Sequence, residues 1–207
     1  MVSLFKNPLS RSGGDAAGAG DAGAGEQRKK RKRTVMVKEL RERDRRRMLK
    51  HFLALDNSDR LLRFGTTLPD ELVESYVAKI DFERDMVYGV YNRVFKLVAV
   101  GHLAFAPKEK SPGKVVTEKE QVAEFGVSVS RSARGLGIGS KLFERAAIHC
   151  RNQDVDTLYM HCLSSNQVMM RIARKAGMEI QREYGEADAY LRLLPANPAS
   201  MLQEALE

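Results

Sequence analysis

The sequence lacks the long apolar segment that a membrane-spanning helix needs. No apolar run approaches the roughly 20 residues that cross a bilayer, and Met1–Lys6 does not begin a secretory signal. Cysteine is also scarce, because the 207 residues include only Cys150 and Cys162. We therefore expect a soluble, cytoplasmic protein whose two cysteines remain thiols in a reducing compartment.

An excess of one charge sign is missing from most of the chain. Residues 1–47 hold 14 Lys/Arg and 6 Asp/Glu, whereas the remaining residues hold 21 of each sign. The net charge of +8 therefore belongs to the amino-terminal part of the chain. It gives no information about the ligand of the electrically balanced body.

The amino-terminal arm has two parts of different composition. Ser12–Gly25 consists mainly of Gly, Ala and Asp, so it has little apolar surface to offset the entropy of ordering. Residues 28–33 are six consecutive cations, which suit weak contact with a polyanion but equally suit a solubilising tail. No aromatic residue interrupts this run, which argues against base stacking. We expect residues 1–33 to be disordered.

A glycine-rich turn, residues 134–140, separates a strand-like segment from an amphipathic helix. It reads Arg-Gly-Leu-Gly-Ile-Gly-Ser and follows the alternating segment Phe125–Val129. Glycines permit positive φ, and the first turn of a helix leaves N–H groups free to bind phosphate oxygens. The alternative is tight strand–helix packing without a ligand. Neither the dinucleotide fingerprint nor the P-loop matches these residues.

The order of predicted elements indicates a mixed sheet flanked by helices. The pattern is neither regular strand–helix alternation nor all-β. We expect a polar loop over Pro107–Thr117. The predicted strands lie near residues 35–40, 86–91, 96–106, 122–129, 157–163, 179–182 and 187–194. The predicted helices lie near residues 44–56, 59–63, 66–80, 138–151 and 166–176.

Two motifs in this order resemble those of the GNAT (general-control-related N-acetyltransferase) superfamily. Residues 134–139 fit its Arg/Gln-x-x-Gly-x-Gly/Ala signature. Asn166 and the later Gly177-Met178 keep the spacing of its second signature, with Met in place of the usual Phe. The resemblance implies an α/β (α+β) fold with a mixed, mostly antiparallel sheet of six to seven strands and helices on both faces. It implies a domain over residues 34–195, followed by a short tail over 196–207.

The same resemblance implies acetyl-coenzyme A as the acyl donor and no metal. An amine would attack the thioester directly, and the acceptor would be a small-molecule amine or a protein lysine. The protein would be a monomer or a homodimer. The expected coenzyme A contacts are Val127, Val129, Arg134, Gly135, Leu136, Gly137, Ile138, Gly139, Ser140 and Asn166.

Glu124 is the candidate general base, because strand alternation separates it from the apolar Ala123 and Phe125. The alternative is an ordinary solvated strand carboxylate. His102 is a second candidate base, although a strand histidine is more often a hydrogen-bonded core residue. Adjacent His161 and Cys162 do not predict a zinc site, because neighbours on a strand point to opposite faces.

The chain departs from the family pattern at Ala173, where many members carry a tyrosine that protonates the departing thiolate. Three accounts stay open: coenzyme A leaves as a thiolate, Tyr159, Ser164 or Ser165 assists, or catalysis has been lost. We therefore predict an N-acetyltransferase and keep two alternatives. One is a non-catalytic acyl-coenzyme A sensor, and the other is a polyanion-associated accessory protein acting through residues 28–33.

Overall fold

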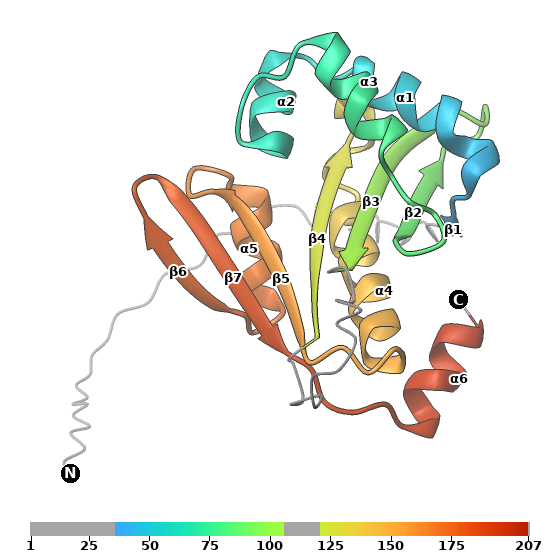
Figure 1. Cartoon of the computed structure of the whole chain (residues 1–207), viewed down its shortest axis with the longest axis vertical. Helices are drawn as coiled ribbons and strands as arrows, with labels where there is room; N and C mark the ends of the chain where they lie inside the picture. The colour runs from blue at the N-terminus through green and yellow to red at the C-terminus, as the bar shows by residue number, and fades with distance from the viewer. Residues whose placement is uncertain (1–35, 106–120, 207) are drawn as a thin grey trace, which may run out of the picture. The chain divides into compact units, whose positions relative to one another are not determined.

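The computed structural model describes residues 36–105 and 121–206. Within these residues, seven strands form one sheet in the order β1-β2-β3-β4-β5-β7-β6, accompanied by six α-helices (Figure 1). The expected mixed, mostly antiparallel sheet is confirmed. The strands are β1 (Val37–Glu39), β2 (Met86–Tyr91), β3 (Leu97–Phe105), β4 (Val122–Val129), β5 (Thr157–Leu163), β6 (Glu179–Glu183) and β7 (Glu186–Arg192).

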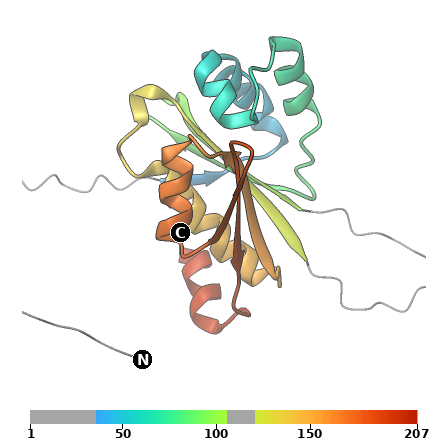
Figure 2. The same cartoon turned by 90° about the vertical axis from the view of Figure 1, so that its left-hand side faces the viewer.

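The helices divide between the two faces of this sheet. Figure 2 shows α4, α5 and α6 grouped together, away from α1, α2 and α3. The α-helices are α1 (Arg45–Leu53), α2 (Asn57–Phe64), α3 (Asp70–Ala78), α4 (Ile138–Asn152), α5 (Gln167–Lys175) and α6 (Pro198–Leu206). Two short 3-10 helices, η1 (Glu42–Asp44) and η2 (Arg131–Ala133), precede α1 and α4.

One strand pair differs from the others because it is parallel and short. β4 pairs with β5 only from Val122–Glu124 to Thr157–Tyr159, whereas the other neighbouring strands are antiparallel. Beyond that point the two strands diverge (Figure 1). We call the space between Phe125–Val129 and Met160–Leu163 the β4–β5 opening. On this side, the second half of β4 has a free edge.

Two apolar clusters hold the layers together. On one face, α4 and α5 pack on β3, β4 and β5 through buried side chains that include Phe125, Leu142 and Met170. On the other face, α1 and α3 pack on β2 and β3 through Phe52 and Val73 among others. The alternation of side chains along the strands feeds both clusters. Helices therefore cover both faces, as expected.

The predicted and observed boundaries of the elements agree best where the local sequence pattern is strong. β4 and β5 have the predicted bounds, since each alternates cleanly. α2 begins at Asn57 rather than near Asp59, because the Asp56 carboxylate accepts a hydrogen bond from the Asp59 backbone N–H and caps the helix. The segment expected as a tail after residue 195 forms α6, which packs on α4.

Some predictions fall outside the described residues. The basic arm over 1–33 and the polar loop over Pro107–Thr117 are among these. The domain limits at residues 34 and 195 stay predictions. Among the helices that the structure does describe, none has the length and apolar character to cross a membrane.

Candidate active site

The glycine turn joins β4 to α4 in the way the sequence predicted. Gly135 and Gly137 adopt positive φ angles of 73° and 76°, which glycine tolerates without strain. Gly137 occupies the N-cap position of α4 and provides no side chain to cap it. The exposed turn therefore leaves first-turn N–H groups, those of Ile138 to Ser140, available to an anion.

Arg134 ties this turn to α2. Its Nη2 lies 2.6 Å from Asp59 Oδ1, and its Nε donates to the Val129 carbonyl at 3.1 Å. Arg131 forms ion pairs with Asp56 and with the same Asp59. These contacts fix the amino-terminal end of α2 beside the turn. The guanidinium of Arg134, an expected coenzyme A contact, therefore already has two protein partners.

The free edge of β4 begins at the turn and leads into the sheet. Val127 and Val129, the expected pantetheine contacts, are half-buried on this edge and pair with β3 on the other side. Asn166 lies across the opening. Its Oδ1 caps α5 by accepting from the Met169 N–H, and its Nδ2 donates to the Leu62 carbonyl of α2. Asn166 thus connects the two helices that border the opening.

A small pocket of about 170 Å³ lies at the inner end of the opening. Glu124 lines it, is exposed, and forms the last parallel pair before the strands separate, opposite Tyr159. A carboxylate at this position can accept a proton from an amine held in the pocket. The lining residues are Leu62, Arg63, Phe64, Gly65, Glu124, Phe125, Gly126, Val127, His161, Cys162 and Met169.

His102 belongs to a buried hydrogen-bond network next to this pocket. Its Nε2 lies 3.1 Å from Asp85 Oδ2, and its Nδ1 lies 2.8 Å from the Tyr76 hydroxyl. In the tautomer that satisfies both contacts, Nε2 donates to Asp85 and Nδ1 accepts from Tyr76. Burial lowers the pKa of His102, although the Asp85 hydrogen bond opposes that shift. The ring is therefore neutral near pH 7. The network uses both ring nitrogens, so His102 has no nitrogen left to accept a substrate proton.

Tyr159, the remaining candidate, hydrogen-bonds to β7. Its hydroxyl donates to Asp188 Oδ1 at 2.6 Å, and His161 Nδ1 lies 2.8 Å from the same oxygen. Burial and the Asp188 hydrogen bond raise the pKa of Tyr159 well above its ordinary value. The hydroxyl therefore stays protonated at neutral pH. The same two hydrogen bonds lower the pKa of Asp188.

Ala173 is buried in the apolar cluster between α5 and the sheet, at 1% exposure. It presents no proton donor to the opening. The strand geometry also separates His161 from Cys162: the histidine is exposed, whereas the cysteine is buried with its Sγ 4.0 Å from Met170 Sδ. These neighbours face opposite sides of β5, as predicted. No group of His, Cys, Asp or Glu residues suited to a metal occurs in residues 36–105 and 121–206.

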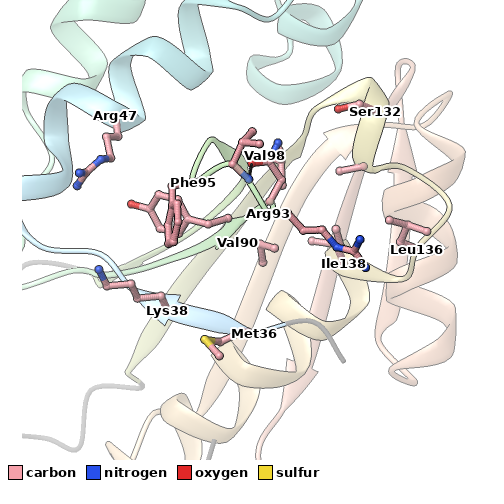
Figure 3. Close-up of a pocket in the computed structure, with 14 residues that line it drawn as sticks. Met36, Lys38, Arg47, Val90, Arg93, Phe95, Val98, Ser132, Leu136 and Ile138 are labelled. Atoms are coloured by element: carbon pink, nitrogen blue, oxygen red, sulfur yellow. Dashed lines mark hydrogen bonds between the residues drawn. The ribbon is translucent and has the colours of Figure 1, made fainter. Parts of the chain in front are cut away.

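A larger pocket, of about 850 Å³, lies beside the glycine turn and shares no lining residue with the smaller one (Figure 3). The tip of the β2–β3 hairpin, with exposed Phe95, borders it together with Leu136 of the turn. Lys38, Arg47 and Arg93 contribute its charged side chains. No carboxylate is among its described lining residues, so the candidate base belongs to the smaller pocket.

The fold and the site agree with a known family. Residues 49–178 match the model of the acetyltransferase (GNAT) family, which is more than half of the chain. The chain belongs to the GNAT acetyltransferase family. Family membership supports acyl transfer to an amine as the general activity. The resemblance inferred from the two motifs is thus confirmed.

Solved GNAT structures share the fold at low sequence identity. The GNAT domain of S. lividans PAT is 18% identical, with a TM-score of 0.61 over 77% of this chain and 90% of that chain. Spermidine N-acetyltransferase from Vibrio cholerae, in complex with CoA and spermine, is 17% identical, with a TM-score of 0.56 over 76% of this chain and 95% of that one. Ribosomal-protein-alanine N-acetyltransferase from Brucella melitensis is 18% identical, with a TM-score of 0.53 over 76% and 99%.

Several polar residues of this GNAT site carry no local sequence signature. Arg63 lines the small pocket, Tyr76 and Asp85 hold His102, and Asp188 holds Tyr159. Each contact joins residues that are distant along the chain, so no local motif indicates it. Arg60 and Arg63 are three residues apart on α2, so the sequence places both on one side of the helix. This spacing does not tell which of the two arginines lines the pocket.

Proposed function

We propose that this GNAT enzyme transfers an acetyl group from acetyl-coenzyme A to a primary amine by direct attack in a ternary complex. The observation that carries the proposal is the course of β4, which leads from the Glu124 pocket to the glycine turn. Val129 is the fifth residue after Glu124, so about 17 Å of strand separates them. An extended pantetheine arm spans a similar length, so diphosphate at the turn brings the thioester to the pocket.

The coenzyme A contacts follow from this course. The N–H groups of residues 136–140 would receive the diphosphate, helped by the positive end of the α4 dipole. The free edge at Val127 and Val129 would pair with the amide groups of the pantetheine arm. Asn166 would keep α2 and α5 at the spacing that the arm requires. No step of this binding requires a metal.

In the chemical step, the acceptor nitrogen attacks the thioester carbonyl. The nitrogen–carbon bond forms, the carbon–sulfur bond breaks, and Glu124 receives the proton released by the amine, directly or through water. Because Ala173 offers no proton, coenzyme A would leave as a thiolate. An ordinary thiol has a pKa of about 8.5, so this leaving group is only mildly basic. Main-chain donors at the free edge of β4 would support the oxyanion.

Two measurements test the proposal. Isothermal calorimetry in reducing buffer should show that the protein binds acetyl-coenzyme A. Mass spectrometry of an amine panel should then detect acetylated products, and Glu124→Gln should lower kcat by about 10²- to 10⁴-fold without loss of acetyl-coenzyme A binding. Glu144→Gln is the matched control, because this exposed carboxylate pairs with Lys175 and does not line the pocket. Unchanged turnover in Glu124→Gln would exclude the assigned base.

A second function is favoured by Ala173 alone. A chain without the family's tyrosine could bind acyl-coenzyme A without turning it over, as a sensor module. The same assays separate the two functions, because a sensor binds acetyl-coenzyme A but acetylates no member of the panel. Product formation that depends on Glu124 eliminates the sensor.

A further inference from the structure

Arg63, near the end of α2, is held in a fixed position by aromatic rings. Its Cζ lies 5.9, 5.1 and 5.5 Å from the ring centroids of Phe52, Phe64 and Tyr76. Its Nη2 also donates to the Tyr76 hydroxyl at 2.7 Å. Stacking on aromatic faces stabilises a guanidinium and restricts its orientation. The side chain is therefore positioned before any ligand arrives.

The guanidinium lies directly against β4 at Gly126. A Cβ added to Gly126 would come within 2.8 Å of Arg63 Cζ, Nη1 and Nη2. Gly126 shares a strand face with Glu124, the candidate base, because it is the second residue after Glu124 along β4. The absence of a side chain at Gly126 thus permits a cation to sit beside the base in the same pocket.

Arg63 differs from its neighbour Arg60 in its charge partners. Within the described part of the chain, no carboxylate forms an ion pair with Arg63, and its buried Nε has no hydrogen-bond partner. Arg60, one helical turn earlier, contrasts with it. Arg60 lies 2.7 Å from Asp70 and donates to three backbone carbonyls, so its contacts are structural. Glu124 lines the same pocket but forms no ion pair with Arg63, so the guanidinium keeps N–H donors that an anion supplied from outside can use.

We propose that Arg63 binds a carboxylate carried by the acceptor, so that the substrates are amines with a carboxylate group. This inference rests on the proposed acetyl transfer. An acceptor in the pocket would direct its amine toward Glu124 and its carboxylate toward Arg63. A guanidinium binds carboxylates through paired N–H donors, which fixes their orientation as well as their charge. A role on the transient oxyanion instead would help every acceptor equally.

Acceptor pairs in which an amide replaces the carboxylate test this proposal. One pair is alanine and alaninamide, and the other is Nα-acetyl-lysine and Nα-acetyl-lysinamide, which covers both α-amine and ε-amine acceptors. With the full-length protein, kcat/KM for the acid in at least one pair should exceed that for the amide by about 10-fold or more. Equal values in both pairs would overturn the proposal.

Two variants then assign the preference to Arg63. In Arg63→Gln, kcat/KM for the acid should fall about 10- to 100-fold, while the amide changes by less than about 3-fold. Gly126→Ala keeps the charge but displaces the guanidinium, so it should reduce the same preference. Arg43→Gln removes an exposed arginine outside the pocket and is the control. Equal losses for acid and amide in Arg63→Gln would reject the carboxylate in favour of the oxyanion role.

A binding measurement separates this inference from the proposed function. Calorimetric titration of each acid and its amide into the protein, with and without coenzyme A, needs no turnover. Selective binding of the acid that Arg63→Gln abolishes supports the carboxylate site even if acetyl-coenzyme A fails to react. Turnover without any preference for the acid upholds the acetyltransferase and rejects the carboxylate site.

Discussion

Around the β4–β5 opening, the two faces of the sheet differ in what they bury. On the α4 and α5 face, β4 and β5 bury apolar side chains such as Phe125 and Met160. On the face covered by α1 to α3, the same sheet places His102, Gly126 and Ser128 beneath polar partners from the helices. The difference separates two tasks. Apolar packing specifies where β4 and β5 run, and the polar face determines which groups meet a substrate.

On the polar face, hydrogen bonds connect the buried polar side chains to one another. Asp85, His102, Tyr76 and Arg63 follow one another at hydrogen-bonding distance, and Arg63 ends at the pocket. Burial raises the pKa of Tyr76 and the field of Arg63 opposes that shift, so the hydroxyl stays protonated. We infer that this set holds Arg63 in place and takes no direct part in proton transfer.

The largest expected effect is on the apolar face. Phe125 is 1% exposed and packs edge-to-face on Phe143, with ring centroids 5.5 Å apart. Phe125→Ala should lower the free energy of unfolding by about 3–5 kcal/mol, measured by urea denaturation. Phe95→Ala, at an exposed hairpin tip, should change it by less than about 0.5 kcal/mol. Similar losses in the two variants would show that burial does not govern stability on this face.

The next effect concerns the polar face and depends on pH. His51 of α1 is buried, with Nε2 2.7 Å from Ser128 Oγ, and burial lowers its pKa to about 4. In the unfolded chain, His51 binds a proton near pH 6.5, whereas in the folded chain it stays neutral until the pH approaches 4. The contribution of His51 to the free energy of unfolding should therefore be fully present above pH 6.5. It should fall by up to about 3 kcal/mol as the pH drops to 4.

His51→Gln removes this titration and provides the comparison. Urea denaturation at several pH values between 4 and 7.5 should give a flatter profile for the variant than for the wild-type protein. Carboxylates titrate in both proteins, so the difference between the two profiles isolates His51. Parallel profiles would mean that His51 is not protonated differently in the folded and unfolded states.

The sequence predicted the apolar face better than the polar one. Alternation gave β4 and β5 their bounds, and the glycines at 135 and 137 indicated a turn that requires positive φ. These signals are local, because each depends on residues a few positions apart. On the polar face, the strand pattern indicated that His102 would be buried, as it is at 9% exposure. The sequence alone therefore predicts the family, the fold and the glycine turn.

What the sequence could not predict depends on distant pairs. Arg63 gains its position from Tyr76 and from Gly126, and neither relation follows a helical or strand period. α6 was missed for the same reason: Glu204 lies 2.6 Å from His149 Nδ1, and this contact joins residues 55 positions apart. Tertiary contacts of this kind decide the site, whereas local patterns decide the scaffold.

The smallest expected effect comes from removing one hydroxyl oxygen on the polar face. Tyr76→Phe deletes the hydroxyl that accepts from Arg63 and donates to His102, but keeps the ring that stacks on Arg63. We expect the free energy of unfolding to fall by about 1–2 kcal/mol, because His102 Nδ1 loses its buried partner. The hydroxyl of Tyr190 has no hydrogen bond to the described residues, so Tyr190→Phe should cost less than about 0.5 kcal/mol.

If Tyr76 only fills space, both variants will have the same stability and the same preference for a carboxylated acceptor. A loss of that preference in Tyr76→Phe alone would show that the hydrogen bond, and not the aromatic ring, sets the position of Arg63.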